Sequence, residues 1–378
     1  MDAEFDKVDI ANWLPYGDQL RVLLSSDHIS LGEVVSLARS KGLFSSGLDR
    51  GQLIQFLSTT LIRPIEFERL LESAVSRESK PKEQPQEVPL TAPDAKWQEK
   101  VRELGDELAT IVRLDKVPGT VFSSDPVISA PAKDHLIVSY EISRQDYSKD
   151  LLHRDLTFRG EISIRQEGGA LSLSVISRHT AKETVKINDQ ILGHIVRNLK
   201  SSGLTKEDAP IKILFGSFDN KNRVLFLLRL AGDKTVGPIP GQIVDLNIKP
   251  NEARDALVSI PELKIFEGAI KNMRMDGNKL NEILLLTNDS FYGHFFLTRV
   301  LVEYTFSLGS HRGKCTVLFY FQIPRNGEDL AAAPFSFSIE SASLDTRKQS
   351  AQLVEAKKAI NTAVLAAIDK HYRELRAI

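Results

Sequence analysis

The apolar positions of the first 75 residues recur with the spacing of short amphipathic helices. Between residues 31 and 41 they fall on one face of a helix, a period that predicts burial against a core. Ser30 and Glu33 have the spacing of a capping box at the start of this helix, and Gly42 stands where a left-handed residue would end it. Asp49 predicts the cap of the next helix. Similar patterns at 18–24 and 65–75 complete a predicted all-helical domain over residues 1–75.

A proline-rich segment follows this domain. Residues 76–94 contain four prolines and almost no large apolar side chain, a composition that predicts a flexible linker. A helical pattern then runs from Trp97 to Ile111. From Leu136 onward the apolar period changes to two, which is typical of strands with one packed and one solvated face. We expect strands at 136–143, 156–166 and 170–177, and a covering helix at 185–203.

The remaining chain continues as strands and helices. Apolar runs at 211–218 and 223–230 flank the turn-forming residues 219–222 and predict a hairpin. We expect partly helical structure at 251–275, strands at 280–287, 295–309, 314–324 and 334–341, and a final helix at 346–375. Residues 95–378 are therefore expected to form an α+β domain with a mostly antiparallel sheet and covering helices, with room for a subdivision near 205–250. A hairpin followed by a helix occurs twice, which fits either a duplicated unit or ordinary α+β topology.

Composition limits the class of protein. The chain has 378 residues, 42% of them hydrophobic, and a formal net charge of −1, so it can form two or three domains and is not a generally basic nucleic-acid coat protein. Its single cysteine, Cys315, excludes a disulfide framework and a thiolate metal cluster. The acidic N-terminus lacks the apolar core of a signal peptide, and no apolar run is long enough to span a bilayer. We expect a cytoplasmic protein without membrane contact.

The second and third predicted helices form a locally basic hairpin. A basic helix, Gly-Leu, a small polar turn with glycine and a helix with Leu-Ile follow one another, and this order resembles the SAP-type DNA-binding motif. The resemblance implies that the turn and the start of the second helix approach the DNA backbone. The matching nucleic-acid-binding positions, with one further base nearby, are Arg39, Lys41, Ser45, Ser46, Gly47, Arg50 and Arg63. A small helical domain that binds another protein explains the same residues.

Three short series in the same region carry a second resemblance. They are Pro15-Tyr16-Gly17-Asp18-x-Leu20-Arg21-x-Leu23-Leu24, Arg39-x-x-Gly42-x-Phe44 and Pro64-x-Glu66-Phe67. Together they resemble the N-terminal domain of the second subunit of a two-gene bacterial anti-phage system found on gamma-mobile-trio genomic islands. This resemblance covers the first fifth of the chain. It implies a companion subunit whose partner, encoded by the neighbouring gene, resembles a PD-(D/E)xK nuclease.

Catalytic motifs are not evident in the sequence. Asp155 with Glu161 lacks the lysine of a PD-(D/E)xK site, and Asp245 with Lys249 has an asparagine where the metal needs a carboxylate. We therefore expect these side chains on solvent-facing strand positions. No GxxxxGK[ST], GxGxxG or HExxH occurs, and Gly232-Asp233-Lys234-Thr235 resembles the tail of a phosphate loop only superficially. We expect neither a cofactor nor a bound metal.

A second basic group lies on or beside the helix expected at 185–203. Lys186, Arg197 and Lys200 can form a further phosphate-binding patch, although a solvated helix face gives the same pattern. The sequence as a whole predicts a non-catalytic, DNA-recognising or scaffolding subunit of a bacterial anti-phage defence complex, a hetero-oligomer in which a nuclease partner performs catalysis. One alternative is a divergent metal-dependent nuclease. Another is a protein-interaction module without nucleic-acid binding.

Overall fold

The described part of the chain folds around three separate hydrophobic cores. The computed structural model describes residues 14, 16–25, 29, 31–44, 49–67, 69–70, 81–93, 96–117, 119–144, 156–166, 170–251, 272–323, 329–345 and 350–376. The first core lies between Leu20 and Leu70, the second between Val88 and Leu199, and the third between Ile213 and Leu375. The first core is helical and the other two belong to an antiparallel sheet with helices, which confirms the predicted α+β class.

The N-terminal helices form where the sequence predicts them. They are α1 (Asp18–Ser25), α2 (Leu31–Ser40) and α3 (Arg50–Ser58), and residues 64–67 are also helical. The Asp49 side chain accepts a hydrogen bond from the Gln52 amide while the Gln52 side chain reaches back to the Asp49 amide, so the expected cap of α3 is a complete capping box. Gly42 ends α2 with φ +81°, as predicted. The Ser30 cap lies outside the described residues.

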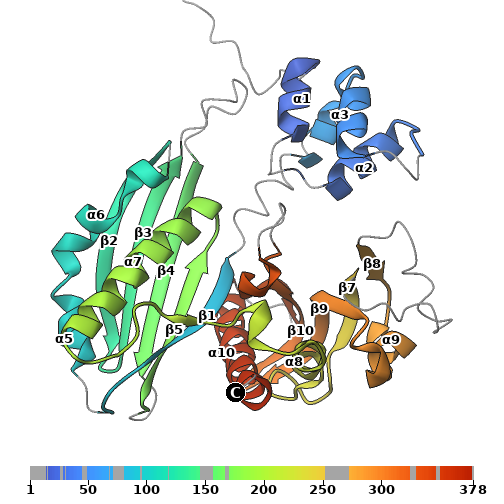
Figure 1. Ribbon diagram of the computed structural model, residues 1–378. Coiled ribbons are helices and arrows are strands. Elements are labelled where there is room, and N and C mark those ends of the chain that lie inside the picture. Colours follow the sequence, from blue (N-terminus) through green and yellow to red (C-terminus); the bar gives the residue numbers. More distant parts are fainter. Residues whose placement is uncertain are drawn as a thin grey trace, which may run out of the picture.

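A single antiparallel sheet runs through the rest of the chain (Figure 1). Its strand order is β2-β3-β4-β5-β1-β11-β10-β9-β7-β8, and β6 pairs with β1 beside this path. The strands are β1 (Lys82–Pro89), β2 (Thr120–Ala132), β3 (His135–Arg144), β4 (Leu156–Gln166), β5 (Ser172–His179), β6 (Ile211–Lys212), β7 (Gln242–Pro250), β8 (Met273–Asp276), β9 (Phe295–Leu308), β10 (His311–Phe321) and β11 (Phe335–Leu344).

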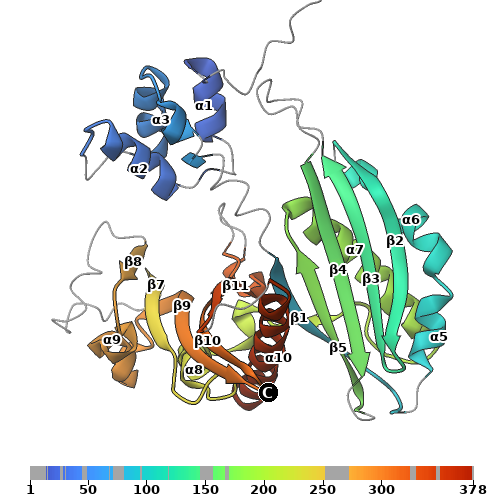
Figure 2. The ribbon, with the colours of Figure 1, turned by 180° about the vertical axis from the view of Figure 1, so that it is seen from behind.

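The helices of the two sheet cores cover opposite faces of the sheet. They are α5 (Trp97–Arg102), α6 (Leu108–Ile111), α7 (Lys182–Ser201), α8 (Asn220–Gly232), α9 (Leu284–Thr287) and α10 (Ser350–Leu375). On β1, Val88 packs into the core of α7, whereas Glu83 accepts a hydrogen bond from Asn361 of α10 at 2.9 Å. Because successive strand residues point to opposite faces, α7 and α10 lie on opposite sides. α7 accordingly lies in front of its strands in Figure 1, and α10 does so in the reverse view of Figure 2.

The linker prediction is wrong for residues 82–89, because these residues form the strand between the two halves of the sheet. The Leu90 amide donates to the Leu171 oxygen. In an antiparallel pair every second residue of a strand points its amide toward the same neighbour, so the even-numbered amides of β1 point toward β5. Pro85 and Pro89 are odd-numbered and lie where β1 needs no donor to β5. Beyond them β1 pairs only briefly with β11 and β6. The prolines therefore do not interrupt the main ladder of this strand.

Other expectations fail for identifiable reasons. Residues 223–230 are helical in α8 and not a strand, because Asp219 caps the helix by accepting from the Asn222 amide. Residues 280–287 form a 3-10 turn and the short helix α9, where a strand was expected. The helix expected at 97–111 is broken by a 3-10 turn at Gly105–Glu107. Strands β2 and β7 were not predicted. Most of residues 251–275 lie outside the described structure.

Candidate functional site

The basic residues of the helical domain are largely engaged within the domain. Glu66 lies at their centre, with 6% of its side chain exposed. Its carboxylate accepts from Lys41 Nζ at 2.6 Å, from the side chain and amide of Arg63 at 2.8 Å each, and from Ser40 Oγ at 3.1 Å. Burial alone would raise the pKa of Glu66, but these hydrogen bonds outweigh it and lower the pKa to about 2. Lys41 and Arg63 therefore have a structural partner.

Arg50 also makes contacts inside the domain. Its Nη2 donates to the backbone oxygens of Leu24 and Ile29, at 2.8 Å each, which ties the start of α3 to the end of α1. Arg39 lies exposed in the last turn of α2, with no ion pair to another residue that the structure describes. Among the predicted bases of the hairpin, Arg39 is thus the clearest surface charge. Residues Ser45, Ser46 and Gly47 lie outside the described structure.

The second predicted basic group lies on α7. Lys186 and Arg197 are exposed, and Arg197 Nε donates to the Gly193 oxygen one turn earlier at 2.8 Å. Lys200 is paired with Asp208 at 2.6 Å. The three cations are spread along the outer side of the helix. Among the described residues, none of them contacts a basic residue of the α2–α3 hairpin.

Two of the carboxylates considered for a nuclease, Asp245 and Glu161, are paired with arginines. The prediction that Asp245 faces solvent is wrong, because it is 4% exposed and its carboxylate is paired with Arg274 and Arg299. Glu161 accepts from Arg178 at 2.7 Å, and Arg178 also bonds Glu83. Asp155 lies outside the described structure. Within the described ranges no group of three or more His, Cys, Asp or Glu side chains can hold a metal ion.

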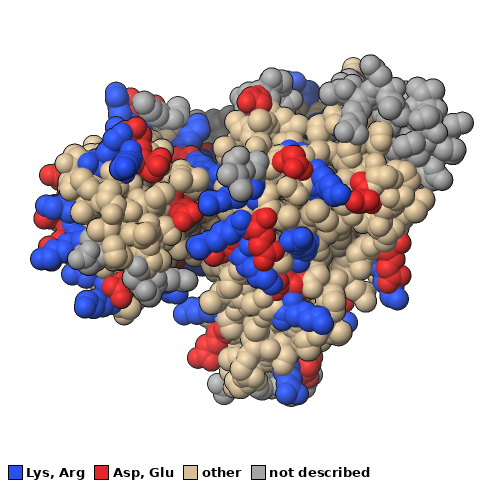
Figure 3. All heavy atoms as spheres, turned by 60° about the horizontal axis from the view of Figure 1, so that its bottom comes forward, with Lys and Arg blue, Asp and Glu red and all other residues tan. Residues whose placement is uncertain are grey.

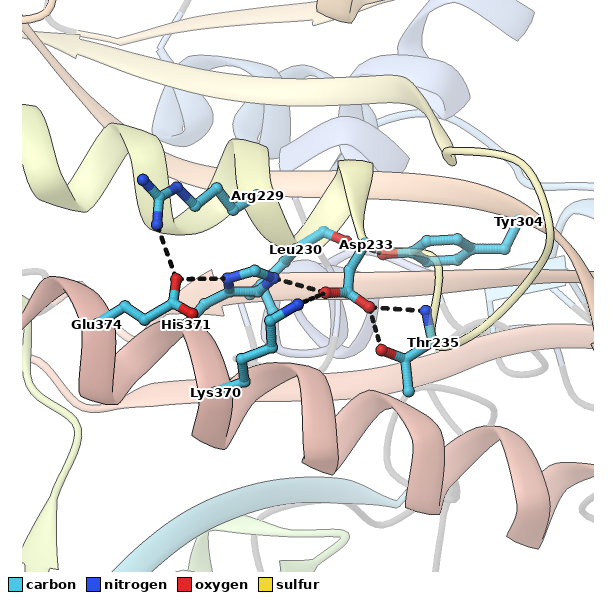
Figure 4. A network of polar contacts seen from close by, with 8 residues as sticks. All are labelled: Arg229, Leu230, Asp233, Thr235, Tyr304, Lys370, His371 and Glu374. Atoms are coloured by element: carbon cyan, nitrogen blue, oxygen red, sulfur yellow. Dashed lines mark hydrogen bonds and ion pairs between the residues drawn. The ribbon is translucent and has the colours of Figure 1, made fainter.

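A cavity of about 740 Å³ lies where the C-terminal end of α8 meets the last turns of α10. At its base Asp233 and His371, 138 residues apart in sequence, are joined by a contact of 2.7 Å between Oδ2 and Nε2 (Figure 4). Lys370 Nζ lies 3.2 Å from the same carboxylate oxygen, and the Thr235 amide donates to Oδ1 at 2.7 Å. The Thr235 hydroxyl contacts Oδ1 as well. The cavity lining is completed by Leu228, Arg229, Gly232 and Lys234.

The protonation of this pair follows from its contacts. Burial opposes ionisation of Asp233, but the hydrogen bonds from Thr235, His371 and Lys370 outweigh it and lower the pKa of the carboxyl to about 2. Because an ionised carboxylate only accepts, His371 Nε2 carries the proton of the shared hydrogen bond. The other ring nitrogen of His371 lies 3.7 Å from Glu374, which itself accepts from Arg229 at 2.9 Å. Polar side chains thus link α8 to α10.

The loop after α8 is held closely against β9. Tyr304 of β9 donates its hydroxyl to the Leu230 oxygen at 2.8 Å, and Gly241 donates its amide to Ala231. A Cβ at Gly237 would collide with the Thr305 oxygen. These contacts fix the position of Asp233 and Thr235. In the sequence, residues 232–235 resemble only an incomplete phosphate loop. No motif connects them with His371, because the pair forms through the packing of α8 on α10.

Comparison with known proteins identifies only the helical domain. Residues 18–80 match the family described as GAPS4b protein N-terminal domain. The match fits the resemblance to a gamma-mobile-trio defence protein, and it covers about a sixth of the chain. A search of curated proteins gave no match. The crystal structure of DynU16, from the dynemicin biosynthetic locus, aligns with 78% of this chain and 99% of its own chain, at 11% sequence identity and a TM-score of 0.22. This similarity is too low to indicate a shared fold. None of the described helices is both long and apolar enough to cross a membrane.

Proposed function

We propose that this protein is a DNA-recognising or scaffolding subunit of a bacterial anti-phage defence complex, in which a nuclease-like protein encoded by the neighbouring gene performs the chemistry. The observation that carries the proposal is the match of residues 18–80 to the GAPS4b protein N-terminal domain. Two carboxylates considered for a metal-dependent nuclease, Glu161 and Asp245, are paired with arginines in the described part of the chain. The proposal therefore assigns catalysis to the partner.

Contact with DNA is assigned to the hairpin of α2 and α3. The SAP-like turn expected from the sequence includes Ser45, Ser46 and Gly47, and Arg39 precedes it as an exposed cation. Phosphate contacts by such cations give salt-dependent, sequence-independent affinity. Since Lys41, Arg50 and Arg63 have partners within the domain, their share of DNA binding is smaller than that of Arg39.

The scaffolding part of the proposal is supported by apolar side chains on the same domain. Phe44 is 81% exposed and Leu61 is 76% exposed. Contiguous exposed apolar patches mark surfaces that bind another protein, and we infer that these side chains contribute to such a surface. Tyr16, Leu31 and Ile65 are also exposed. A stable hetero-oligomer with the nuclease-like partner would cover such residues.

The test is a titration of the purified chain, alone and with the neighbouring gene product, against labelled duplex and single-stranded DNA at several salt concentrations with Mg²⁺ present. Cleavage is measured on the same samples. We expect salt-dependent binding without cleavage by the isolated chain, and cleavage when the partner is added. Cleavage by the chain alone would overturn the assignment of catalysis to the partner.

Arg39→Glu tests the DNA contact directly. Reversal of one exposed charge removes a phosphate contact and should weaken binding about tenfold at low salt, with a shallower salt dependence. The matched control is Arg69→Glu, because Arg69 is exposed on the same domain but lies outside the predicted contact set. Equal affinities of both variants and the original chain would remove the hairpin from the DNA interface.

A further inference from the structure

The cavity beside Asp233 presents hydrogen-bond donors and few free acceptors. Arg229, Lys234 and Lys370 line it, and all three side chains are at least partly exposed. Lys234 makes no hydrogen bond or ion pair with any residue in the described ranges. Lys370 uses one of its three ammonium protons on Asp233, and Arg229 uses part of its guanidinium on Glu374. Unused N–H groups from three cations therefore face the same space.

The acidic groups of the cavity are already occupied. Asp233 receives four contacts, two on each oxygen, from Thr235, His371 and Lys370. A carboxylate with two oxygens has about four lone-pair positions, so Asp233 has no capacity left for a metal cation. Glu374 is paired with Arg229. The chemistry of the lining thus favours an anion over a cation.

The cavity walls are held in place before any ligand arrives. α8 and α10 pack against each other in the third core, and Tyr304 fixes the last turn of α8. Gly232 has no neighbouring atom within 4 Å of the position that a Cβ would take, so the entrance beside it is open. Figure 3 shows the face that carries the C-terminal end of α10, where Lys and Arg side chains gather near the centre with acidic side chains between them. The backbone that carries the donors is therefore ordered before binding, and only the lysine and arginine side chains need to be ordered by the ligand.

We propose that this cavity binds a phosphate group, presented either by a free nucleotide or by the backbone of a nucleic acid. Lys234 and Lys370 contact the phosphate oxygens, while the Thr235 hydroxyl stays bonded to Asp233. His371 and Asp233 are positioning residues, because their mutual hydrogen bond holds the Lys370 turn of α10 against the loop after α8. The site lies outside the helical domain, so phosphate binding here does not depend on whether the hairpin of α2 and α3 contacts DNA.

The test measures binding of inorganic phosphate and ADP to the full chain by calorimetry, and of a labelled DNA duplex by fluorescence anisotropy. The DNA measurement uses the Arg39→Glu background so that the helical domain contributes little. Lys234→Glu should weaken binding of each ligand that uses the site about tenfold, the loss of one charge-assisted hydrogen bond. Lys370→Gln should weaken it by a similar factor. Lys357→Glu is the control, because Lys357 is exposed on the same helix but about 20 Å along it from Lys370.

The two sources of phosphate are distinguished by competition. If the duplex displaces ADP from the original chain and not from Lys234→Glu, the backbone of a nucleic acid is the ligand. If ADP binds and the duplex does not displace it, the ligand is a free nucleotide. Lys234→Glu has no described contact to lose, so its melting temperature should equal that of Lys357→Glu, which separates loss of binding from loss of folding. Absence of binding of all three probes at 10 mM phosphate or ADP and 10 µM duplex, or equal binding by the three lysine variants, overturns the proposal.

Discussion

Replacing Glu66 by glutamine should destabilise the helical domain by about 2–3 kcal/mol. The carboxylate is buried and accepts four hydrogen bonds, from Ser40, Lys41 and Arg63. Lowering its pKa from 4.5 to about 2 corresponds to roughly 3 kcal/mol of preference for the ionised form in the folded state. Because the Arg63 side chain is 66% exposed, solvent screens its share and reduces the figure toward about 2 kcal/mol.

The size of this loss matters because the domain is small. A domain of this length has a total stability of only several kcal/mol, and Lys41, with 16% of its side chain exposed, would lose its carboxylate partner. The assay is hydrogen exchange of the α2 and α3 amides in the full chain, which gives the free energy of local opening. The exchange of amides in β9 and β10, in a different core, serves as an internal control. Arg69→Gln is the matched variant on the domain surface.

The pH dependence has a definite sign. Since the folded pKa of Glu66 is lowered, its contribution is fully present above about pH 4.5 and is lost as the pH falls toward 2. After correction for intrinsic exchange rates, the difference between the original chain and Glu66→Gln should therefore shrink between pH 5 and pH 2.5. Equal opening free energies at pH 7, or a difference that does not change with pH, would refute the stabilising role of the carboxylate.

Three further substitutions test other parts of the fold by urea-induced unfolding. Gly160→Ala should cost about 2–3 kcal/mol or prevent folding, because the added Cβ would overlap the ring of the buried Tyr140; unchanged stability would contradict this packing. Arg223→Met should cost about 3 kcal/mol, since the buried guanidinium donates to the backbone oxygens of Phe215 and Phe218 at 2.9 Å each, and Arg223→Lys should not restore it because one ammonium cannot reach both. Asp245→Asn should lower the free energy of unfolding by about 1–2 kcal/mol, because Arg274 and Arg299 lose their charged partner. Any Mg²⁺-dependent DNA cleavage by the complex should be unchanged. Loss of cleavage would make Asp245 an active-site candidate again.

Elements with one packed and one solvated face could be predicted from the sequence. β3, β4, β5, β9, β10 and β11 alternate apolar and polar residues, and α7 and α10 carry apolar stripes at helical spacing. α8 was missed because a continuous apolar run fits a buried strand as well as a buried helix. β2 was missed because it is an edge strand with mostly exposed residues and an irregular register with β3. Neither element shows the alternation on which such predictions depend.

The cavity could not be predicted for a different reason. Its two central residues, Asp233 and His371, come together only when α10 packs on α8. They are 138 residues apart, and no sequence motif with a fixed spacing indicates the contact. The basic hairpin, in contrast, is local, and its two helices and the Asp49 cap of α3 were predicted from the sequence. The role of each basic residue could not be predicted there. Lys41 and Glu66 are 25 residues apart, and their pairing depends on how the helical segment at residues 64–67 packs against α2.

Strand β1 shows how tertiary contacts override local composition. Its sequence is polar and contains two prolines, and only Val88 belongs to a hydrophobic core. Its position is fixed by Glu83, which accepts from Arg178 on β5 at 2.9 Å and from Asn361 on α10 at 2.9 Å. The same carboxylate therefore contacts both halves of the sheet. Because β1 meets β11 at a single residue pair, Glu83 with Phe337, the two sheet cores are coupled there mainly through polar contacts of one side chain, and not through a shared apolar interior.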